Sequence, residues 1–329
     1  MKSSSIVALA CGLVLALVCL AICPAPAPAL AIDPPIVKKL ISCVDMGRLK
    51  NVVRVLVNEF GPRHADHSVP FIDDKCTPRV QEPYPVNNAI MSGLWVEQYY
   101  QKLGYKVEKV PVPLGFKGAM GFNVVAVKKG TVYPNTYIDV MSHLDSEKNC
   151  PGAEDNAPGV AATMEIAAIL ADYPSRYSLR FIHTMGHEHE GMQDIGSMIH
   201  VSESLKRGEV IKVGIIIDGI AWVEPGVDTM NVLDYKGAES GRVADVICAA
   251  QKKYGIAINC RKDTYSLESD NFSYKFFNQT AVLSIGGVPF MHPVTKCLDV
   301  YSRLLDRSWQ NVFLTTQLDL AGILELDAE

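Results

Sequence analysis

The stretch TYIDVMSHLDSEKNCPGAEDNAPGVAATMEIAAILADYPSRYSLRFIHTM, residues 136–185, decides the fold. Residues 136–143 are rich in β-formers, residues 159–173 have the composition of a helix, and residues 179–185 are a second β-rich run. Strands that alternate with helices are typical of α/β proteins. We therefore expect an α/β fold whose sheet has parallel strands at its centre.

The rest of the chain continues this alternation. Further strands are predicted at 105–112, 122–130, 212–218 and 281–287, and further helices at 36–60, 86–103, 240–254 and 298–325. Residues 61–85 contain prolines, aspartates and histidines and are predicted to form a long loop. No linker divides the chain after the N-terminal segment, so we expect one catalytic domain over residues 32–329.

Composition limits the class of protein. The chain has 329 residues, of which 48% are hydrophobic and 20% are charged, as in globular proteins that bury a sizeable core. Its formal net charge is -5 and it contains no basic run. We therefore expect no binding to nucleic acid.

The N-terminus reads as a signal peptide. A lysine near the start precedes an apolar run at 6–23, and Ala29-Leu30-Ala31 matches a small-residue cleavage site. Residues 1–31 would be removed, which predicts a secreted or periplasmic protein with no stable membrane insertion. The apolar run is at the lower limit of a membrane span, so an uncleaved anchor is the alternative.

Export makes the cysteines interpretable, because disulfides persist in oxidising compartments. Six of the nine cysteines would remain after cleavage: Cys43, Cys76, Cys150, Cys248, Cys260 and Cys297. We expect the pairs Cys43–Cys76 and Cys248–Cys260, although sequence alone does not fix the pairing. No C-x-x-C spacing indicates a zinc–thiolate site.

Polar residues follow the predicted strands. His143 and Asp145 come at the end of one, Glu188 and His189 follow the next, and Asp218 ends a third. In open α/β sheets, sites form at the carboxyl ends of strands. Taken singly, each has a structural alternative, such as a turn at a strand end.

Two later candidates have structural alternatives of their own. Asp155 could belong to a helix N-cap together with Asn156, and His292 could be an ordinary loop histidine.

Together these residues indicate a metal centre. Asp218 ends a buried apolar run, where a carboxylate needs a partner. Imidazole and carboxylate ligands suit zinc, and two ligand sets that share a carboxylate would hold two metals. Such a centre needs a general base that is not a ligand, and Glu188 fits that role.

In their order along the chain, these motifs resemble the secreted di-zinc aminopeptidases of bacteria and fungi, whose relatives include glutamate carboxypeptidases and glutaminyl cyclases. The motifs are His143-Leu144-Asp145, Asp155-Asn156-Ala157-Pro158-Gly159, Glu188-His189-Glu190-Gly191, Asp218 and His292, with Asn123-Val124-Val125-Ala126 and Ser269-Asp270 as weaker matches. The similarity covers roughly residues 36–325, and GAEDNAPGVAATMEIAAIL is its most specific segment.

The resemblance implies a three-layer sandwich with a mixed, centrally parallel sheet flanked by helices. It implies two Zn²⁺ ions per chain, with a single ion as the alternative, and a peptide substrate. Asp155 would bridge the metals, His143 and Asp218 would complete one site, and His189 and His292 the other. Glu188 would be the general base, and Asp145 would hold the ring of His143.

Two positions depart from the family pattern. His189 stands where the family has a second glutamate. This replacement removes a negative charge and could weaken the binding of the second metal. His187 or Glu190 could serve instead, although both, with His183, are expected to be flanking structure. Pro293 replaces the usual threonine after His292. The remaining histidines, His64, His67 and His200, are expected to be at the surface or satisfied.

The function expected is hydrolysis of the N-terminal peptide bond. A carboxypeptidase or dipeptidase is the alternative, with Arg261 available for a substrate carboxylate, and a glutaminyl cyclase is another. A non-catalytic binding domain on the same scaffold would not depend on Glu188. The sequence gives no oligomeric state.

Overall fold

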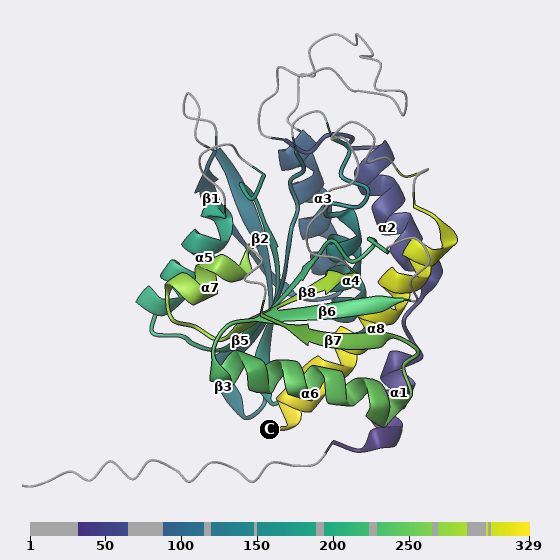
Figure 1. Ribbon diagram of the computed structural model, residues 1–329. Helices are drawn as coiled ribbons and strands as arrows, with labels where there is room; N and C mark the ends of the chain where they lie inside the picture. Colours follow the sequence, from purple (N-terminus) through teal and green to yellow (C-terminus); the bar gives the residue numbers. More distant parts are fainter. Residues whose placement is uncertain are drawn as a thin grey trace, which may run out of the picture.

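The computed structural model describes residues 32–64, 88–114, 120–147, 150–188, 194–223, 229–264, 269–287, 301 and 304–329. Figure 1 shows one twisted sheet with helices on both sides. Its strands are β1 (Lys106–Pro113), β2 (Met120–Lys128), β3 (Tyr133–His143), β4 (Tyr177–Thr184), β5 (Val210–Asp218), β6 (Met230–Tyr235), β7 (Asn259–Asp263) and β8 (Ala281–Gly286). Its helices are α1 (Pro34–Ile41), α2 (Met46–Asn58), α3 (Asn88–Lys102), α4 (Ala157–Leu170), α5 (Ile195–Lys206), α6 (Ala238–Tyr254), α7 (Asn271–Phe276) and α8 (Asp306–Ala328).

The sheet is parallel at its centre, antiparallel towards the β1 edge, and mixed towards the other edge, where β6 and β7 pair in the parallel sense. The strand order is β1-β2-β4-β3-β5-β8-β6-β7. The four central strands, β4, β3, β5 and β8, run parallel, whereas β1 pairs with β2, β2 with β4, and β6 with β8 in the antiparallel sense. The predicted mixed, centrally parallel sheet is confirmed.

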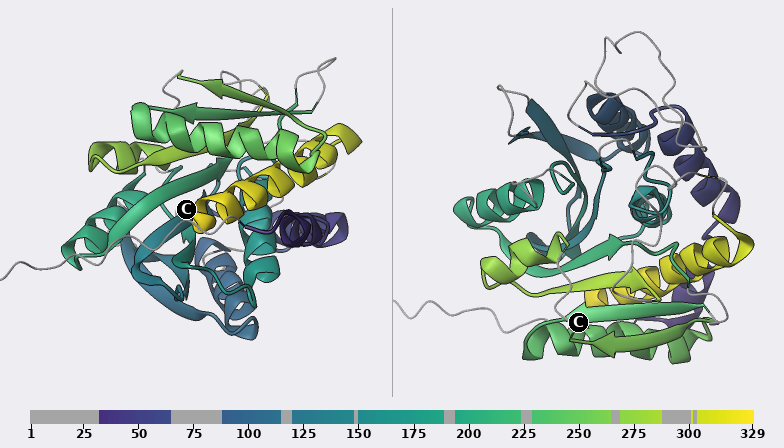
Figure 2. Two further views of the ribbon diagram at one scale, coloured as in Figure 1. Left: turned by 90° about the horizontal axis from the view of Figure 1, so that it is seen from below. Right: turned by 45° about the horizontal axis from the view of Figure 1, so that its top comes forward.

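Alternate residues of the central strands bury two different faces, as the period of two in a strand requires. On β5, Val213, Ile215 and Ile217 pack into the larger core, which includes residues of α1, α2, α3, α4, α6 and α8. Ile216 points to a smaller core that it shares with Val201 of α5 and Tyr274 of α7. Figure 2 shows the resulting three layers, which confirms the predicted sandwich.

Helix α4 lies at the centre of the larger core. Its residues 157–167 are all buried, because small residues let it fit between the sheet and helices α2 and α8. Glu165 is the one acidic residue among them, and its carboxylate accepts hydrogen bonds from the Arg48 side chain at 2.6 and 2.8 Å. The helix is therefore fixed on both sides, and its N-terminus is held at the carboxyl end of the sheet.

The long predicted helix at 36–60 is two helices, because a helix start lies inside it. Asp45 caps α2 by accepting a hydrogen bond from Arg48 N at 2.7 Å. Its own main-chain NH donates to Glu165 Oε1 at 2.8 Å. Hydrophobic periodicity does not reveal a contact between residues that are 120 positions apart in the sequence.

Other boundaries also differ from the prediction. The closing helix begins at Asp306 and not at residue 298, and four elements were not predicted: α5, β6, β7 and α7. These are short or weakly patterned, and β7 is exposed along much of its length. Most of the predicted loop at 61–85 lies outside the described residues.

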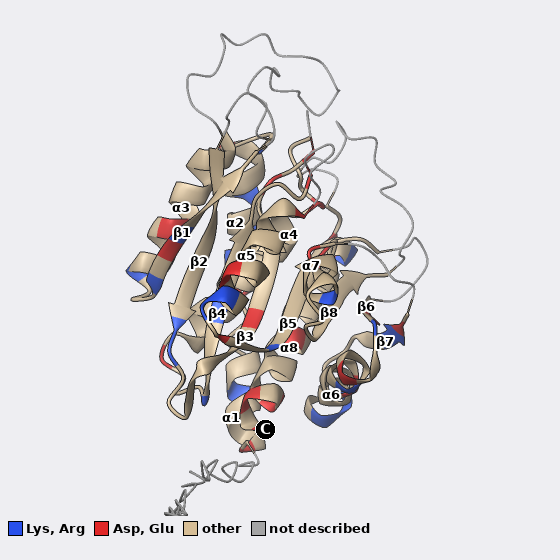
Figure 3. Cartoon of the chain, turned by 90° about the vertical axis from the view of Figure 1, so that its left-hand side faces the viewer, with Lys and Arg blue, Asp and Glu red and all other residues tan. Residues whose placement is uncertain are grey.

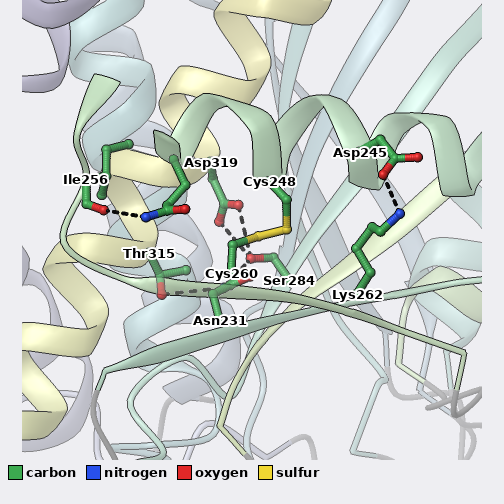
Figure 4. The surroundings of a disulfide bond; sticks show 10 residues. Asn231, Asp245, Cys248, Ile256, Cys260, Lys262, Ser284, Thr315 and Asp319 are labelled. Atoms are coloured by element: carbon green, nitrogen blue, oxygen red, sulfur yellow. Dashed lines mark hydrogen bonds and ion pairs between the residues drawn. A yellow bond between two sulfur atoms is a disulfide. The ribbon is translucent and has the colours of Figure 1, made fainter. Parts of the chain in front are cut away.

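The disulfide predictions have mixed outcomes. The Cys248–Cys260 bond is confirmed and joins α6 to the edge strand β7 (Figure 4). The predicted Cys43–Cys76 bond is wrong for this structure, since Cys43 is an exposed free thiol that donates to the main-chain oxygen of Lys39 at 3.3 Å. Cys76 lies outside the described residues.

The predicted signal peptide, residues 1–31, also lies outside the described residues. Among the helices that the structure does describe, none combines the length and the apolar composition needed to cross a bilayer.

A buried ion network stabilises the smaller core. Asp139 on β3 accepts hydrogen bonds from Arg180 on β4 at 2.6 and 3.0 Å and from the Tyr274 hydroxyl at 2.9 Å. His200 of α5 lies 3.3 Å from the same carboxylate. Burial would raise the pKa of Asp139, but the Arg180 charge and the His200 hydrogen bond lower it to about 2. His200 is thus a satisfied histidine, as predicted.

Asp319 of α8 is a buried carboxyl group behind the disulfide (Figure 4). Both of its oxygens accept from the Ser284 hydroxyl, at 3.0 and 2.9 Å, and that hydroxyl accepts from Asn231. Burial raises the pKa of Asp319 from 3.8 to about 7, against the lowering effect of the Ser284 hydrogen bond. The folded state therefore holds a proton that the unfolded chain releases.

This shift predicts a pH-dependent stability. The contribution of Asp319 is fully present below about pH 4 and is lost as the pH rises to about 7, by up to about 1.4 kcal/mol per pH unit. We expect Asp319→Asn to gain stability relative to the wild type between pH 5 and pH 8. Urea unfolding at both values measures the difference, and an equal difference at both would contradict the assignment.

A candidate metal centre at the carboxyl end of the sheet

Three parallel strands end at the same level and bring their last residues together. His143, the last residue of β3, is opposite Thr184, the last residue of β4. On the other side Met141 is opposite Ile216, which places His143 level with Asp218 at the end of β5. Figure 3 shows acidic residues gathered on the loops above α4 and α7, at this end of the sheet. The strand register therefore assembles the centre.

His143 lies between two carboxylates. Its Nε2 atom is 3.0 Å from Asp155 Oδ1 and 3.4 Å from Asp218 Oδ1. The atom is fully buried, yet it forms no hydrogen bond in acceptable geometry. Its other ring nitrogen, Nδ1, donates to the main-chain oxygen of Asp145 at 3.0 Å. A buried imidazole nitrogen that lies between two carboxylates and makes no hydrogen bond fits a metal ligand.

Asp155 is placed by the start of α4. The side chain of Asn156 caps the helix by accepting from Gly159 N at 3.0 Å, and its amide donates to the main-chain oxygen of Ile217 at 2.8 Å. The Asp155–Asn156 peptide bond is cis. A Cβ on Gly159 would lie 2.4 Å from Ile217 O, so only glycine permits this approach. The D-N-x-x-G motif thus docks α4 against the residue that precedes Asp218.

Asp145 fixes the loop that follows β4. Its Oδ2 accepts hydrogen bonds from the main-chain NH groups of Gly186 and Glu188, both at 3.0 Å. Burial would raise the pKa of Asp145, but the His143 ring, whose Nδ1 atom lies 3.8 Å from Asp145 Oδ1, lowers it. Asp145 therefore positions Glu188 as well as the ring of His143.

Arg63 is a positioning residue that sequence reasoning missed. Its fully buried side chain donates to the main-chain oxygens of Leu144 at 2.7 Å, Pro151 at 2.6 Å and Gly152 at 3.2 Å. These oxygens lie on the two segments that carry Asp145 and Asp155. No sequence signal marks Arg63, because these three acceptors are main-chain oxygens of residues at least 81 positions away.

The acidic residues of the centre differ in their affinity for protons. Burial, and next the charge of Asp155, raises the pKa of Glu188 well above its ordinary value. Burial would also raise the pKa of Asp218, but the charge of the neighbouring His143 ring lowers that pKa. When the pKa values of neighbouring carboxyl groups differ in this way, one group stays ionised and the other can exchange a proton.

A second group of titratable residues adjoins the first. His187 Nδ1 lies 2.7 Å from Asp194 Oδ1, and Asp270 lies close to both. Burial would lower the pKa of His187, but the hydrogen bond that its ring donates to Asp194 and the charge of Asp270 raise it to about 10. Ser269 donates to Asp218 Oδ2 at 2.7 Å. Asp194 was not singled out from the sequence.

The remaining candidates are placed as follows. His189, Glu190 and His292 lie outside the described residues. His183 is buried, with its ring nitrogens 2.8 Å from the Tyr100 hydroxyl and 3.1 Å from the Ser142 hydroxyl. Burial lowers its pKa to about 3, so it is a neutral residue of the core.

The donor set fits zinc. His143, Asp155 and Glu188 form one group whose ligand atoms lie within 4.8 Å of one another, and His143, His187 and Asp218 form another. Nitrogen and oxygen donors in a buried cluster of this size are the ligands that zinc takes in proteins. The described residues can therefore hold at least one metal ion.

Comparison with known proteins agrees with this geometry. The model of peptidase family M28 matches residues 123–306, more than half of the chain. The chain belongs to peptidase family M28. Its matched segment contains the candidate residues from His143 to His292.

Individual proteins match this chain either over a short stretch or at low sequence identity. Aminopeptidase YwaD of Bacillus subtilis (strain 168) is 33% identical over 116 residues, which span 34% of this chain and 25% of that protein. The fold resembles that of BSAP, a zinc aminopeptidase from Bacillus subtilis, with a TM-score of 0.66 at 14% identity, over 86% of this chain and 95% of BSAP. It also resembles a glutaminyl cyclase from Bacteroides thetaiotaomicron, with a TM-score of 0.60 at 18% identity, over 84% of this chain and 97% of the cyclase.

The Gly159 contact gives a test of how the centre is held. We expect Gly159→Ala to reduce the free energy of unfolding by about 1–3 kcal/mol, because its methyl group would force α4 away from β5. Chemical denaturation measures the loss. The half-buried Ala168 is the control, since Ala168→Gly in the same helix should cost only about 0.5–1 kcal/mol. Equal losses in the two variants would contradict the docking role.

Proposed function

We propose that this member of family M28 is an exported, zinc-dependent aminopeptidase. The observation that carries the proposal is the buried Nε2 atom of His143, which lies between the carboxylates of Asp155 and Asp218 without a hydrogen bond. The match to the family and the local identity to an aminopeptidase support the same reaction class.

Each residue has a proposed role. Asp155 would be shared by the two zinc ions, His143 and Asp218 would hold one of them, and His189 and His292 would hold the other. When bound, the ions would polarise the scissile carbonyl group and lower the pKa of a water molecule. Asp145 holds the ring of His143 and the loop that carries Glu188.

Glu188 is the proposed general base. It is held beside Asp155 and His143, and its raised pKa suits a group that takes a proton from the attacking water. The same carboxyl group then returns the proton to the leaving amine. One residue thus serves both halves of the hydrolysis, provided that its carboxylate is not itself bound to metal.

The acidic centre favours a substrate with a free amine, because carboxylates attract an ammonium group. A carboxypeptidase needs a cation for the substrate carboxylate, and Arg261 was the residue available. It is exposed on β7 and separated from β5 by β8 and β6, and its guanidinium contacts Met230 Sδ at 3.8 Å. This position does not favour the carboxypeptidase alternative.

A glutaminyl cyclase is the second candidate, because the fold is also similar to that of such an enzyme. The two activities differ in their products and can be separated directly. A hydrolase releases the first residue of a peptide, whereas a cyclase closes an N-terminal glutamine and cleaves no peptide bond.

The substrate proposal is tested with mature protein that begins at Ile32. We expect it to cleave aminoacyl nitroanilides but not their N-acetylated forms, to lose activity with a chelator, and to regain it with zinc. Peptides with N-terminal glutamine and peptides with free C-termini are the comparison substrates. Ring closure or C-terminal release without nitroanilide cleavage would overturn the proposal.

The general-base proposal is tested with Glu188→Gln, which keeps the size of the side chain. We expect kcat to fall by at least about 100-fold while the zinc content is unchanged, because the lost group moves a proton and does not bind metal. Activity and metal content are measured on the same preparation. Unchanged kcat would exclude this role, and a non-catalytic binding domain would show no turnover in either protein.

A further inference from the structure

His187 lies against the metal centre, although the proposed function gives it no role there. Its ring stacks on the ring of His143 with centroids 4.1 Å apart and planes inclined by 26°. A nitrogen of His187, a nitrogen of His143 and an oxygen of Asp218 all lie within 4.8 Å of one another. The two imidazoles therefore reach the same small volume beside Asp218.

The far side of the His187 ring is held by a carboxylate. Nδ1 lies 2.7 Å from Asp194 Oδ1, so the ring donates this hydrogen bond and Nε2 is the nitrogen left for another partner. Histidines that bind metals almost always donate their second ring nitrogen to a carboxylate, a carbonyl or water, which fixes the tautomer and the ring plane. The Asp194–His187 pair has this arrangement.

The backbone conformation of Asp194 favours the hydrogen bond with His187 over a capping hydrogen bond to α5. Asp194 occupies the N-cap position of α5, where an aspartate normally accepts a hydrogen bond from the helix. Here the side chain makes no capping bond, and the residue has a left-handed conformation with φ 62°. The carboxylate is turned to His187 instead.

A second carboxylate completes the surroundings of the ring. Asp270 is fully buried, and its Oδ2 accepts from the Thr184 hydroxyl at 2.7 Å, whereas its Oδ1 makes no hydrogen bond. Ligand atoms of Asp270, Asp194 and His187 lie within 4.8 Å of one another. Negative charge behind an imidazole makes its ring nitrogen a stronger metal ligand.

We propose that His187, oriented by Asp194, is a further zinc ligand in the site formed by His143 and Asp218. The inference rests on the proposed zinc centre and adds to it a residue outside the five family motifs. With Asp155 counted, this site would have four protein ligands, His143, His187, Asp218 and Asp155, whereas the other would have three. We therefore expect this site to bind zinc more tightly.

The test measures zinc binding and not activity alone. Purified full-length mature protein is stripped of metal, and zinc affinity is measured by competition with a chromophoric chelator. We expect His187→Gln to weaken the tighter zinc by at least about 10-fold and Asp194→Asn to weaken it by a smaller factor, since it removes only the orienting charge. His200→Gln is the matched control, because His200 is also buried and paired with an aspartate, but on another part of the fold.

A second readout is independent of affinity. With both metals replaced by cobalt, X-ray absorption counts the imidazoles per metal ion. We expect this number to fall in His187→Gln and to stay constant in His200→Gln. Circular dichroism of each metal-free variant checks that the fold is intact, and Asp194→Asn serves if His187→Gln does not fold.

The outcomes separate this inference from the proposed function. His143→Gln should lose the tighter zinc, and zinc binding that survives this change would refute the proposed centre itself. If His143→Gln loses zinc while His187→Gln keeps wild-type affinity and imidazole number, the centre stands and the inference is overturned. His187 would then be an ion-pair partner of Asp194 and Asp270.

Discussion

The hydrogen bond from the Asn156 amide to the main-chain oxygen of Ile217 is the contact on which the centre depends. It docks the first turn of α4 onto the last residues of β5, and Gly159 permits the close approach. Asp155 and Asp218 are the residues next to the two bonded groups, so one contact sets the spacing of two proposed ligands. The buried residues of α4 also pack against the sheet and α2, so the position of the helix is fixed relative to both.

The protein stabilises its buried carboxylates in two different ways. In the smaller core, Asp139 is neutralised by Arg180 and bonded to Tyr274, which is a complete ion pair within the protein. At the carboxyl end of the sheet, Asp155 and Asp218 face the buried nitrogen of His143. The first arrangement rigidifies the fold, and the second keeps donor atoms directed at a position that a cation can fill.

Much of the architecture could be predicted, since the central strands are apolar and β-rich and the strand ends carry the polar residues. The prediction failed where long-range contacts override local pattern. A single helix was expected at 36–60, but Glu165 accepts from the main chain at Asp45 and helps to start a new helix there. The short elements α7 and β7 were missed because a few residues carry little periodicity. The free thiol of Cys43 shows that spacing does not establish a disulfide.

The sequence by itself determined the fold class and the strand-end residues of the candidate centre. These are local properties, because hydrophobic pattern and strand order place His143, Glu188 and Asp218 at the carboxyl end of a parallel sheet. Only the tertiary structure decided that Arg63 fixes the loops and that His187 lies against His143 with Asp194 behind it. The physical reason is that these contacts depend on how loops pack and on which distant atoms a side chain meets, and residue order does not record that.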